Sequence, residues 1–307
     1  MSARGGTLVI HPGALGDVVL TIPALRALRA ERPDEPLTLA AQPRLARLLM
    51  ALGEVDRVLD FESLRLASLF TGEPCPARPL LEQMSRVVCW FGSREPSFVA
   101  NLRAIAPCAV VAAPSAADVP VWQHLRRTVG AALDGGTRVL QVPRGVAEAG
   151  RRALLDLGSD GTHPVVLIHP GAGGVVKRWP IDGFATVARD VIQRRRSVTL
   201  TVHQGPADLQ AASDLLAALG PVAMRLLEPP LETLAGILAG VSLYLGNDSG
   251  VSHLAAALGA PCVIPFTREL LGWRPWAAGV HLPVVSARAL MPVDLDRVLA
   301  AAREAMP

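Results

Sequence analysis

The sequence has little charge, few aromatic residues and a single lysine. Of its 307 residues, 19% are charged and 4% are aromatic, and the formal net charge is only +3. So small a positive excess, without a dense run of basic residues, argues against a nucleic-acid partner. The chain also lacks any apolar run approaching the ~18 residues that a membrane-spanning helix needs.

Cysteine is scarce, and nothing at the start of the chain indicates export. Residues 1–6 show no charged segment followed by a long apolar stretch, so we expect no signal peptide. The cysteines lie far apart without a C-x-x-C pair, at Cys75, Cys89, Cys108 and Cys262. This spacing favours small apolar residues in a reducing compartment over a disulfide framework or a metal site. We therefore expect a cytoplasmic protein without a bound metal. Peripheral contact with the inner face of the membrane is left open.

Short apolar runs alternate with segments of helical periodicity along the whole chain, which is typical of parallel sheets covered by helices. The expected strands are residues 7–11, 37–41, 55–61, 86–91, 109–113, 165–169, 198–203, 224–227, 242–245 and 262–266. The expected helices are residues 17–29, 184–195, 209–219, 231–239, 251–258 and 295–306. Pro23 interrupts the first of these, so a kink or two abutting helices are expected there.

The length and a change of composition predict two domains. A chain of 307 residues suggests two domains of roughly 150 residues each. Residues 134–161 combine Gly, Pro and Arg with little strand character, so we place the boundary near residue 150, giving domains 1–150 and 151–307. The last helix follows Pro292, and we consider that it packs back onto the first domain. Two such α/β domains facing each other leave a cleft at the carboxyl ends of their strands, where ligands bind.

The first segment that could carry chemistry is His11-Pro-Gly-Ala-Leu-Gly-Asp17, which leads from a strand into a helix. Gly13 and Gly16 permit a tight turn and the close approach of a ligand. Two interpretations of Asp17 stay open: an N-cap that accepts bonds from helix amides, or a functional carboxylate at the cleft. The glycine pattern is not G-x-G-x-x-G, which counts against a dinucleotide-binding fingerprint.

The second segment is His169-Pro-Gly-Ala-Gly-Gly-Val-Val-Lys-Arg-Trp-Pro180. The backbone amides of a turn rich in glycine (Gly171, Gly173 and Gly174), followed by Lys177 and Arg178, suit a diphosphate. It is not a Walker A loop, because Arg178 follows the lysine in place of Ser or Thr. Lys177 is the only lysine, in a chain whose other basic residues are all arginine. The ammonium of lysine is a compact point charge and the guanidinium of arginine is a broad fork, so the two side chains bind a phosphate differently. Chance retention at a surface position is the alternative.

The third segment is Gly246-Asn-Asp-Ser-Gly-Val-Ser-His253, again at the end of an apolar strand. Asp248 and Ser249 can cap the helix that begins near Gly250, and the capped amides with the helix dipole form an anion site. His253 lies one turn into this helix and faces either a ligand or the sheet. The segment repeats the position of the second one, which favours ligand binding over a plain junction.

Together, in this order, the three segments resemble the heptosyltransferase family, glycosyltransferase family 9. The family has a Leu-Gly-Asp turn followed by an apolar helix with an early proline, matched by residues 15–17 and 22–25. It has a His-Pro-Gly turn leading to Lys-x-Trp-Pro, matched by residues 169–171 and 177–180. It also has Asp-Thr/Ser-Gly-x-x-His, matched by residues 248–253. The resemblance extends from about residue 7 to residue 267.

This resemblance implies a GT-B fold, in which two Rossmann-like domains with parallel sheets face each other across a cleft. The acceptor binds the N-terminal domain and the nucleotide sugar binds the C-terminal one. Family members invert the anomeric centre without a catalytic metal and need no cofactor. The donor is typically ADP-heptose, and the acceptor is the lipopolysaccharide core or a related lipid-linked oligosaccharide. By the same resemblance, Asp17 is the general base, and Lys177 with the turn at Asp248, Ser249 and Gly250 holds the diphosphate.

Two departures from the family pattern bear on specificity. Where the family commonly has Gly-Pro-x-Glu near the ribose, this chain has Asp208, which is one methylene shorter. Only Thr267 remains of the usual Gly-Pro-Thr turn. Three alternatives remain: a GT-B epimerase, a non-catalytic nucleotide-sugar-binding protein and a nicotinamide dehydrogenase. The ordered motifs disfavour the first, the presence of Asp17 argues against the second, and the missing glycine fingerprint argues against the third.

Overall fold

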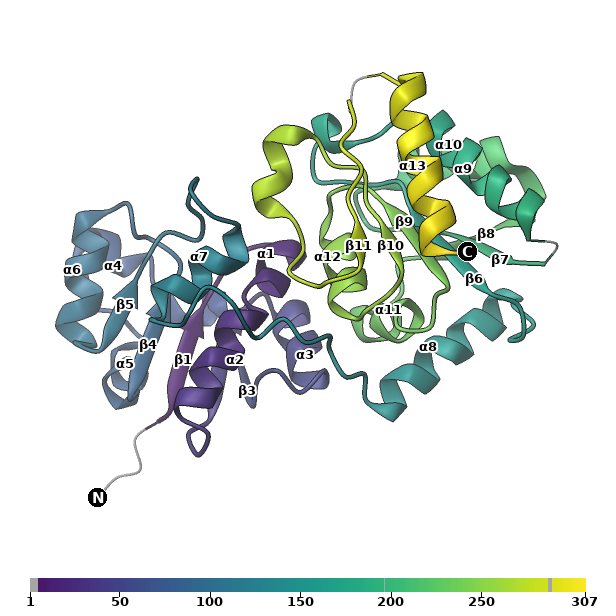
Figure 1. Ribbon diagram of the computed structural model, residues 1–307. Helices are drawn as coiled ribbons and strands as arrows, with labels where there is room; N and C mark the ends of the chain where they lie inside the picture. Colours follow the sequence, from purple (N-terminus) through teal and green to yellow (C-terminus); the bar gives the residue numbers. More distant parts are fainter. Residues whose placement is uncertain (1–4, 196, 287–288) are drawn as a thin grey trace. The chain divides into compact units, whose positions relative to one another are not determined.

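The computed structural model describes residues 5–195, 197–286 and 289–307, and the chain forms two compact units (Figure 1). The first unit is Met1–Thr137 and the second is Arg138–Pro307. This division corrects the boundary expected near residue 150, because helix α8 (Arg144–Leu157) packs against α11 (Leu231–Leu238) of the second unit. Residues 1–4, within the segment expected to lack a signal peptide, fall outside the described range.

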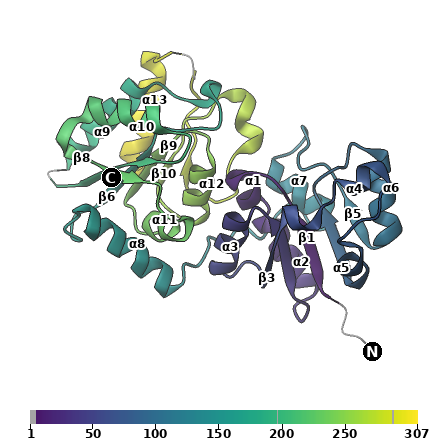
Figure 2. The same ribbon diagram turned by 180° about the vertical axis from the view of Figure 1, so that it is seen from behind.

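The first unit is built on a parallel sheet with strand order β3-β2-β1-β4-β5. These strands are β1 (Thr7–Ile10), β2 (Leu37–Ala41), β3 (Arg57–Asp60), β4 (Arg86–Cys89) and β5 (Ala109–Val111). Helices α4 (Ser68–Thr71), α5 (Arg78–Gln83) and α6 (Pro96–Ile105) lie on one side of the sheet (Figures 1 and 2). Helices α2 (Ile22–Glu31), α3 (Pro43–Ala51) and α7 (Val121–Thr128) lie on the other. The five strands expected in this half are confirmed.

The expected interruption at Pro23 is also confirmed. Helix α1 (Leu15–Leu20) ends at Thr21, and α2 starts at once with proline as its second residue. Proline has no N–H to donate and is therefore tolerated in the first turn of a helix but not in its interior. The Thr21 hydroxyl donates to the carbonyl of Val18 at 2.7 Å and satisfies one carbonyl at the end of α1.

The second unit has a parallel sheet with strand order β11-β10-β9-β6-β7-β8. Its strands are β6 (Val165–His169), β7 (Thr199–Gln204), β8 (Ala223–Leu227), β9 (Leu243–Gly246), β10 (Cys262–Val263) and β11 (Val280–His281). The five strands expected here are confirmed. The two-residue strand β11 was not expected, because so short a segment carries no periodic signal.

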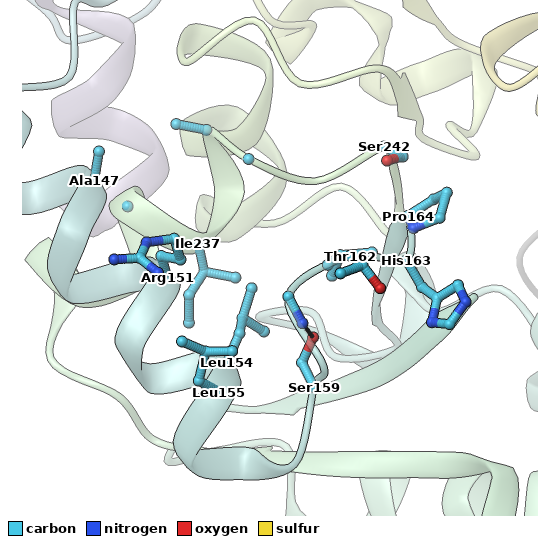
Figure 3. A pocket seen from close by; sticks show the side chains of 15 residues that line it. Ala147, Arg151, Leu154, Leu155, Ser159, Thr162, His163, Pro164, Ile237 and Ser242 are labelled. Atoms are coloured by element: carbon cyan, nitrogen blue, oxygen red, sulfur yellow. Dashed lines mark hydrogen bonds between the residues drawn. The ribbon is translucent and has the colours of Figure 1, made fainter. Parts of the chain in front are cut away.

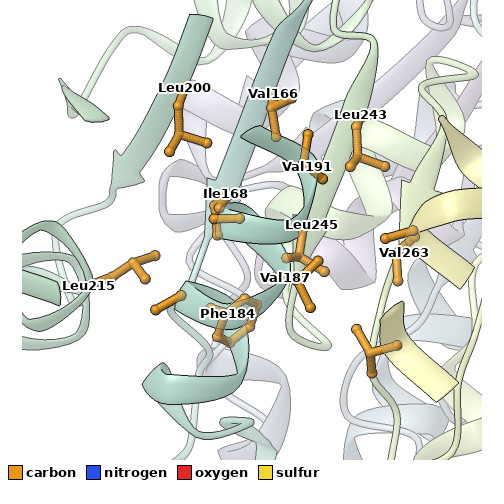
Figure 4. Packing of buried hydrophobic residues seen from close by; sticks show 14 of the residues in the cluster. Val166, Ile168, Phe184, Val187, Val191, Leu200, Leu215, Leu243, Leu245 and Val263 are labelled. Carbon is orange, nitrogen blue, oxygen red and sulfur yellow. The ribbon is translucent and has the colours of Figure 1, made fainter. Parts of the chain in front are cut away.

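Helices α9 (Ile181–Arg194), α10 (Leu209–Leu219) and α13 (Pro292–Ala305) cover one face of the second sheet. Their apolar side chains pack with those of β6, β7 and β9 into a buried core around Phe184, Val187 and Leu215 (Figure 4). Helix α13 belongs to this core through Val298 and Ala302, so it packs within the second unit. The packing considered for it on the first domain stays a prediction. Helices α8, α11 and α12 (Gly250–Ala257) complete the unit.

Among the described residues, no helix is both long enough and apolar enough to cross a membrane.

Candidate active site

The second and third motifs are adjacent because they follow neighbouring strands. In the register of β6 and β9, His169 lies beside Gly246, so the loops that leave both strands begin side by side. One loop carries the glycine-rich turn and the short helix η2 (Val175–Lys177) before α9 begins. The other leads through Asp248 into α12. Both loops lie at the carboxyl edge of the sheet, the usual ligand-binding edge of a parallel sheet.

Lys177, Asp248 and His253 form one polar cluster where these two loops meet. The Lys177 ammonium lies 2.7 Å from Asp248 Oδ2, and His253 Nε2 lies 3.5 Å from Oδ1 of the same carboxylate. Asp248 is almost fully buried. Burial alone would raise its pKa, but hydrogen bonds from His253 and Lys177 outweigh this and hold the pKa below its usual range. His253 Nδ1 is buried and has no hydrogen-bond partner in the described structure.

The glycine-rich turn presents free backbone amides. Within the described part of the chain, the N–H groups of residues 171–174 donate no hydrogen bond. A Cβ atom at Gly173 or Gly174 would meet no atom within 4 Å, so these two glycines border open space. A Cβ atom at Gly171 would lie only 2.0 Å from Asp208 Oδ1, so the close approach of that carboxylate requires glycine. Arg178 braces the turn by donating from Nη2 to the carbonyl of Ala172 at 3.1 Å.

Asp208 faces inward, towards two buried histidines. Its Oδ2 lies 3.8 Å from His169 Nε2, and the Nδ1 atoms of His169 and His203 are 3.0 Å apart. Burial lowers the pKa of His169 to about 4, and burial together with the neighbouring imidazole lowers that of His203 to about 3. Both rings are therefore neutral at physiological pH. Burial also raises the pKa of Asp208. The ribose contact expected for Asp208 stays a prediction.

Helix α12 begins as the sequence predicted. Ser249 is its N-cap, and its hydroxyl accepts from the Ser252 N–H at 3.3 Å. Gly250 is the first helical residue. Asp248 does not cap the helix as considered, because its carboxylate is engaged by Lys177 and His253. The start of α12 thus directly follows Asp248, the carboxylate that holds the Lys177 ammonium.

Asn247 is a site residue that no motif in the sequence singles out. Its side chain donates from Nδ2 to the carbonyl of Pro170 at 2.8 Å and accepts at Oδ1 from the Trp179 N–H at 2.9 Å. It therefore connects the two ends of the loop that carries Lys177. Its position at a strand end, beside Asp248, was the only signal available in the sequence.

In the first unit, Asp17 lies in the third position of α1, and the N-cap is Ala14. The N-cap interpretation of Asp17 is therefore wrong. Its Oδ2 accepts from the Ala14 N–H at 2.9 Å, reaching back across the first turn. Gly13 allows this packing, because a Cβ atom there would lie 2.5 Å from His11 Cε1 and 2.7 Å from Asp17 Cβ. Gly16 occupies the first turn of α1.

His11 completes the turn around Asp17. Its Nδ1 accepts from the Gly13 N–H at 3.0 Å, which makes Nε2 the protonated nitrogen of a neutral ring. Burial lowers the pKa of His11 despite the nearby Asp17 carboxylate. Asp17 is half-buried, and its Oδ1 makes no hydrogen bond within the described structure. One carboxylate oxygen thus fixes the side chain while the other stays available.

The described part of the second unit contains cavities at both edges of its sheet. One, of about 530 Å³, lies between α8 and α11 at the amino ends of β6 and β9, opposite the edge with Lys177 (Figure 3). The other, of about 680 Å³, is lined by Val176 beside Lys177 and by residues after β10. Across the described ranges, no group of three or more His, Cys, Asp or Glu residues could hold a metal ion.

Two parallel sheets covered by helices form the architecture of the GT-B glycosyltransferases, and solved structures of that class share it. A glycosyltransferase family 9 structure from Veillonella parvula matches with a TM-score of 0.79 at 16% identity, over 100% of this chain and 98% of that one. The Escherichia coli ADP-heptose lipopolysaccharide heptosyltransferase II matches with a TM-score of 0.73 at 19% identity, over 97% and 99%.

The sequence comparisons define the family. The family model of glycosyltransferase family 9 (heptosyltransferase) matches residues 115–279, more than half of the chain. The lipopolysaccharide heptosyltransferase 2 of Salmonella typhimurium is 26% identical over 284 residues, covering 83% of this chain and 81% of the relative. The chain belongs to glycosyltransferase family 9 and is a glycosyltransferase.

Proposed function

We propose that the enzyme transfers heptose from ADP-heptose to a lipopolysaccharide core or related lipid-linked acceptor, with inversion and without a metal ion. The relatives support this choice, because one is a lipopolysaccharide heptosyltransferase and another is named for ADP-heptose. A lipid-linked acceptor would bring the enzyme to the inner face of the cytoplasmic membrane. The arrangement around Lys177 is the observation that carries the proposal.

The diphosphate of the nucleotide sugar binds where unpaired backbone N–H groups and positive charge lie together. The amides of residues 171–174 donate to no described group, and the amino end of α12 at Ser249 and Gly250 adds its dipole. Lys177 can donate further bonds while it keeps Asp248, because an ammonium has three N–H groups. Such groups stabilise the charge that grows on a departing nucleoside diphosphate. Arg178 follows Lys177 in its loop, and His253 lies in the first turn of α12.

Asp17 acts on the acceptor as general base. Its carboxylate takes the proton from the acceptor hydroxyl, and the oxygen attacks the anomeric carbon. The bond from that carbon to the diphosphate breaks, and its electron pair leaves with ADP. One displacement of this kind inverts the anomeric centre. Removal of the proton by a placed base contributes typically ~10²–10⁴-fold to the rate.

The test is a transfer assay with a panel of nucleotide sugars and a defined core acceptor. We expect turnover with ADP-heptose, little with UDP- or GDP-sugars, and a product whose anomeric configuration by NMR is inverted. Lys177→Ala serves as the donor-site control. Transfer from a uridine donor alone, or a product with retained configuration, contradicts the proposal.

A further inference from the structure

The side chain of Asn247 ties together the two ends of a loop. Nδ2 donates to Pro170 O at 2.8 Å, and Oδ1 accepts from Trp179 N at 2.9 Å. A carbonyl only accepts and a backbone N–H only donates, so the two partners fix the orientation of the amide group. The side chain is 0% exposed, so water cannot replace either bond. Loss of this side chain would leave a buried donor and a buried acceptor unpaired.

The middle of the loop, residues 173–176, makes few contacts with the rest of the protein. Val175 and Val176 are 76% and 64% exposed, and Gly173 and Gly174 border open space. The backbone bonds within the loop are short-range, from Lys177 N to Gly174 O and from Arg178 N to Val175 O. A segment with so little packing takes its conformation from the points where it is attached.

Each end of the loop is attached to a packed part of the second unit. Pro170 directly follows the central strand β6. Trp179 is buried, and its ring packs edge-on against Phe184 with centroids 5.2 Å apart. A Cβ atom at Gly183 would lie 2.6 Å from that ring, which shows how closely it is seated. Asn247 sets the distance between these two points, and its neighbour Asp248 holds Lys177.

We infer that Asn247 is a positioning residue for the donor diphosphate: through Pro170 O and Trp179 N it holds the Gly171–Lys177 loop in its binding conformation. This inference rests on the proposed function of that loop. Asn247 acts through the loop amides and Lys177. A purely structural side chain would affect unfolding without affecting the environment of Lys177 or the affinity for ADP.

The single lysine makes a direct test feasible. Protein grown with ¹³C,¹⁵N-lysine gives one set of side-chain signals, from Lys177. Asn247→Ala removes both bonds, and we expect its Lys177 signals to shift without ligand and its affinity for ADP to fall at least about tenfold. The matched control is Asn101→Ala, which removes a comparable bond, Nδ2 to Leu69 O at 2.9 Å, in the first unit. The control should leave Lys177 and ADP binding unchanged.

Asn247→Asp is a second variant, of nearly the same shape, and its readout is the pH dependence of ADP affinity. An ionised carboxylate accepts from Trp179 N but repels Pro170 O, whereas a protonated carboxyl can donate to it. Its deficit in ADP affinity should therefore shrink as the pH falls, while that of Asn247→Ala stays constant relative to the parent. This variant also carries the test if Asn247→Ala does not fold.

The outcomes separate the two proposals. Failure of ADP to shift the Lys177 signals of the parent would contradict the proposed donor site, while the ligand-free spectra would still decide whether Asn247 holds the loop. Parent-like Lys177 signals and parent-like ADP affinity in a folded Asn247→Ala variant would overturn the inference.

Discussion

Replacing Asp17 by asparagine should slow transfer strongly while leaving the fold intact. In the structure, Oδ2 accepts one bond from the Ala14 N–H, and Oδ1 is available. The amide oxygen of asparagine can accept the same bond, but an amide has no basicity near neutral pH. The two functions of this side chain, bracing the turn and removing a proton, are therefore separable by a change of a single atom.

The expected loss of stability and the expected loss of activity differ enough to be distinguished. Loss of charge at the third position of α1 weakens the bond and the helix-dipole interaction by about 1 kcal/mol, or a few degrees in Tm for a unit of this size. Loss of the base should reduce kcat by ~10² or more, which corresponds to at least ~2.7 kcal/mol of transition-state stabilisation. The affinity for ADP should be unchanged, because Asp17 lies in the first unit and the donor loops lie in the second.

The assay measures initial rates of heptose transfer for the parent and for Asp17→Asn, with thermal melting and ADP titration on the same samples. Asp17→Ala, which loses the bond to Ala14 as well, controls for the structural contribution. A parental rate in Asp17→Asn would refute the reasoning, and the base would have to be another residue.

Three further predictions concern the second unit. Lys177→Ala should weaken ADP binding more than tenfold in calorimetric titration, since a charge-assisted contact is worth ~1.5–3 kcal/mol and Asp248 loses its bond from the ammonium; equal affinities would remove Lys177 from the site. Turnover should survive EDTA, because the charge of the leaving diphosphate is compensated by Lys177 and amides; a requirement for added Mg²⁺ or Mn²⁺ would refute this. Stability should fall on acidification, because the folded-state pKa values of His169 and His203, about 4 and about 3, lie below the ~6.5 of an unfolded histidine. The unfolded chain therefore binds more protons as the pH falls below ~6.5, and the loss continues towards the folded values. Urea unfolding at about pH 7 and about pH 5 should show a smaller loss for His203→Asn than for the parent; equal losses would mean that His203 does not titrate in this way.

The sequence was most informative where side-chain patterns repeat. Ten strands were expected from short apolar runs, because a strand buried on both faces is apolar at nearly every position, as in residues 165–169. The helix at residues 144–157 was missed, because its Gly and Arg content and the preceding Pro143 resemble a linker. Its packing on α11 depends on Gly150 meeting Gly236, a contact between residues far apart in the sequence. Such a tertiary contact is invisible to local periodicity.

At the site, motifs identified residue types but not their partners. The sequence placed Lys177 and Asp248 in two separate segments as independent diphosphate ligands, and the structure pairs them at 2.7 Å. It placed Asp208 near a ribose, and the structure brings its carboxylate against Gly171. Asn247 was missed for the same reason. Its partners, Pro170 O and Trp179 N, are backbone atoms that a side-chain pattern does not record.

The ion pair gives a physical reason for a lysine in a chain whose other basic residues are all arginine. A guanidinium beside Asp248 would form a flat two-bond pair with that carboxylate and direct its donors in fixed directions. An ammonium uses one N–H for Asp248 and keeps two that can donate to an anion, as the free amides of residues 171–174 also can. Asp248 therefore orients Lys177 and leaves two of its N–H groups available for a ligand. On this argument the pair is part of the proposed donor site, with Asp248 holding the charge in place until a diphosphate arrives.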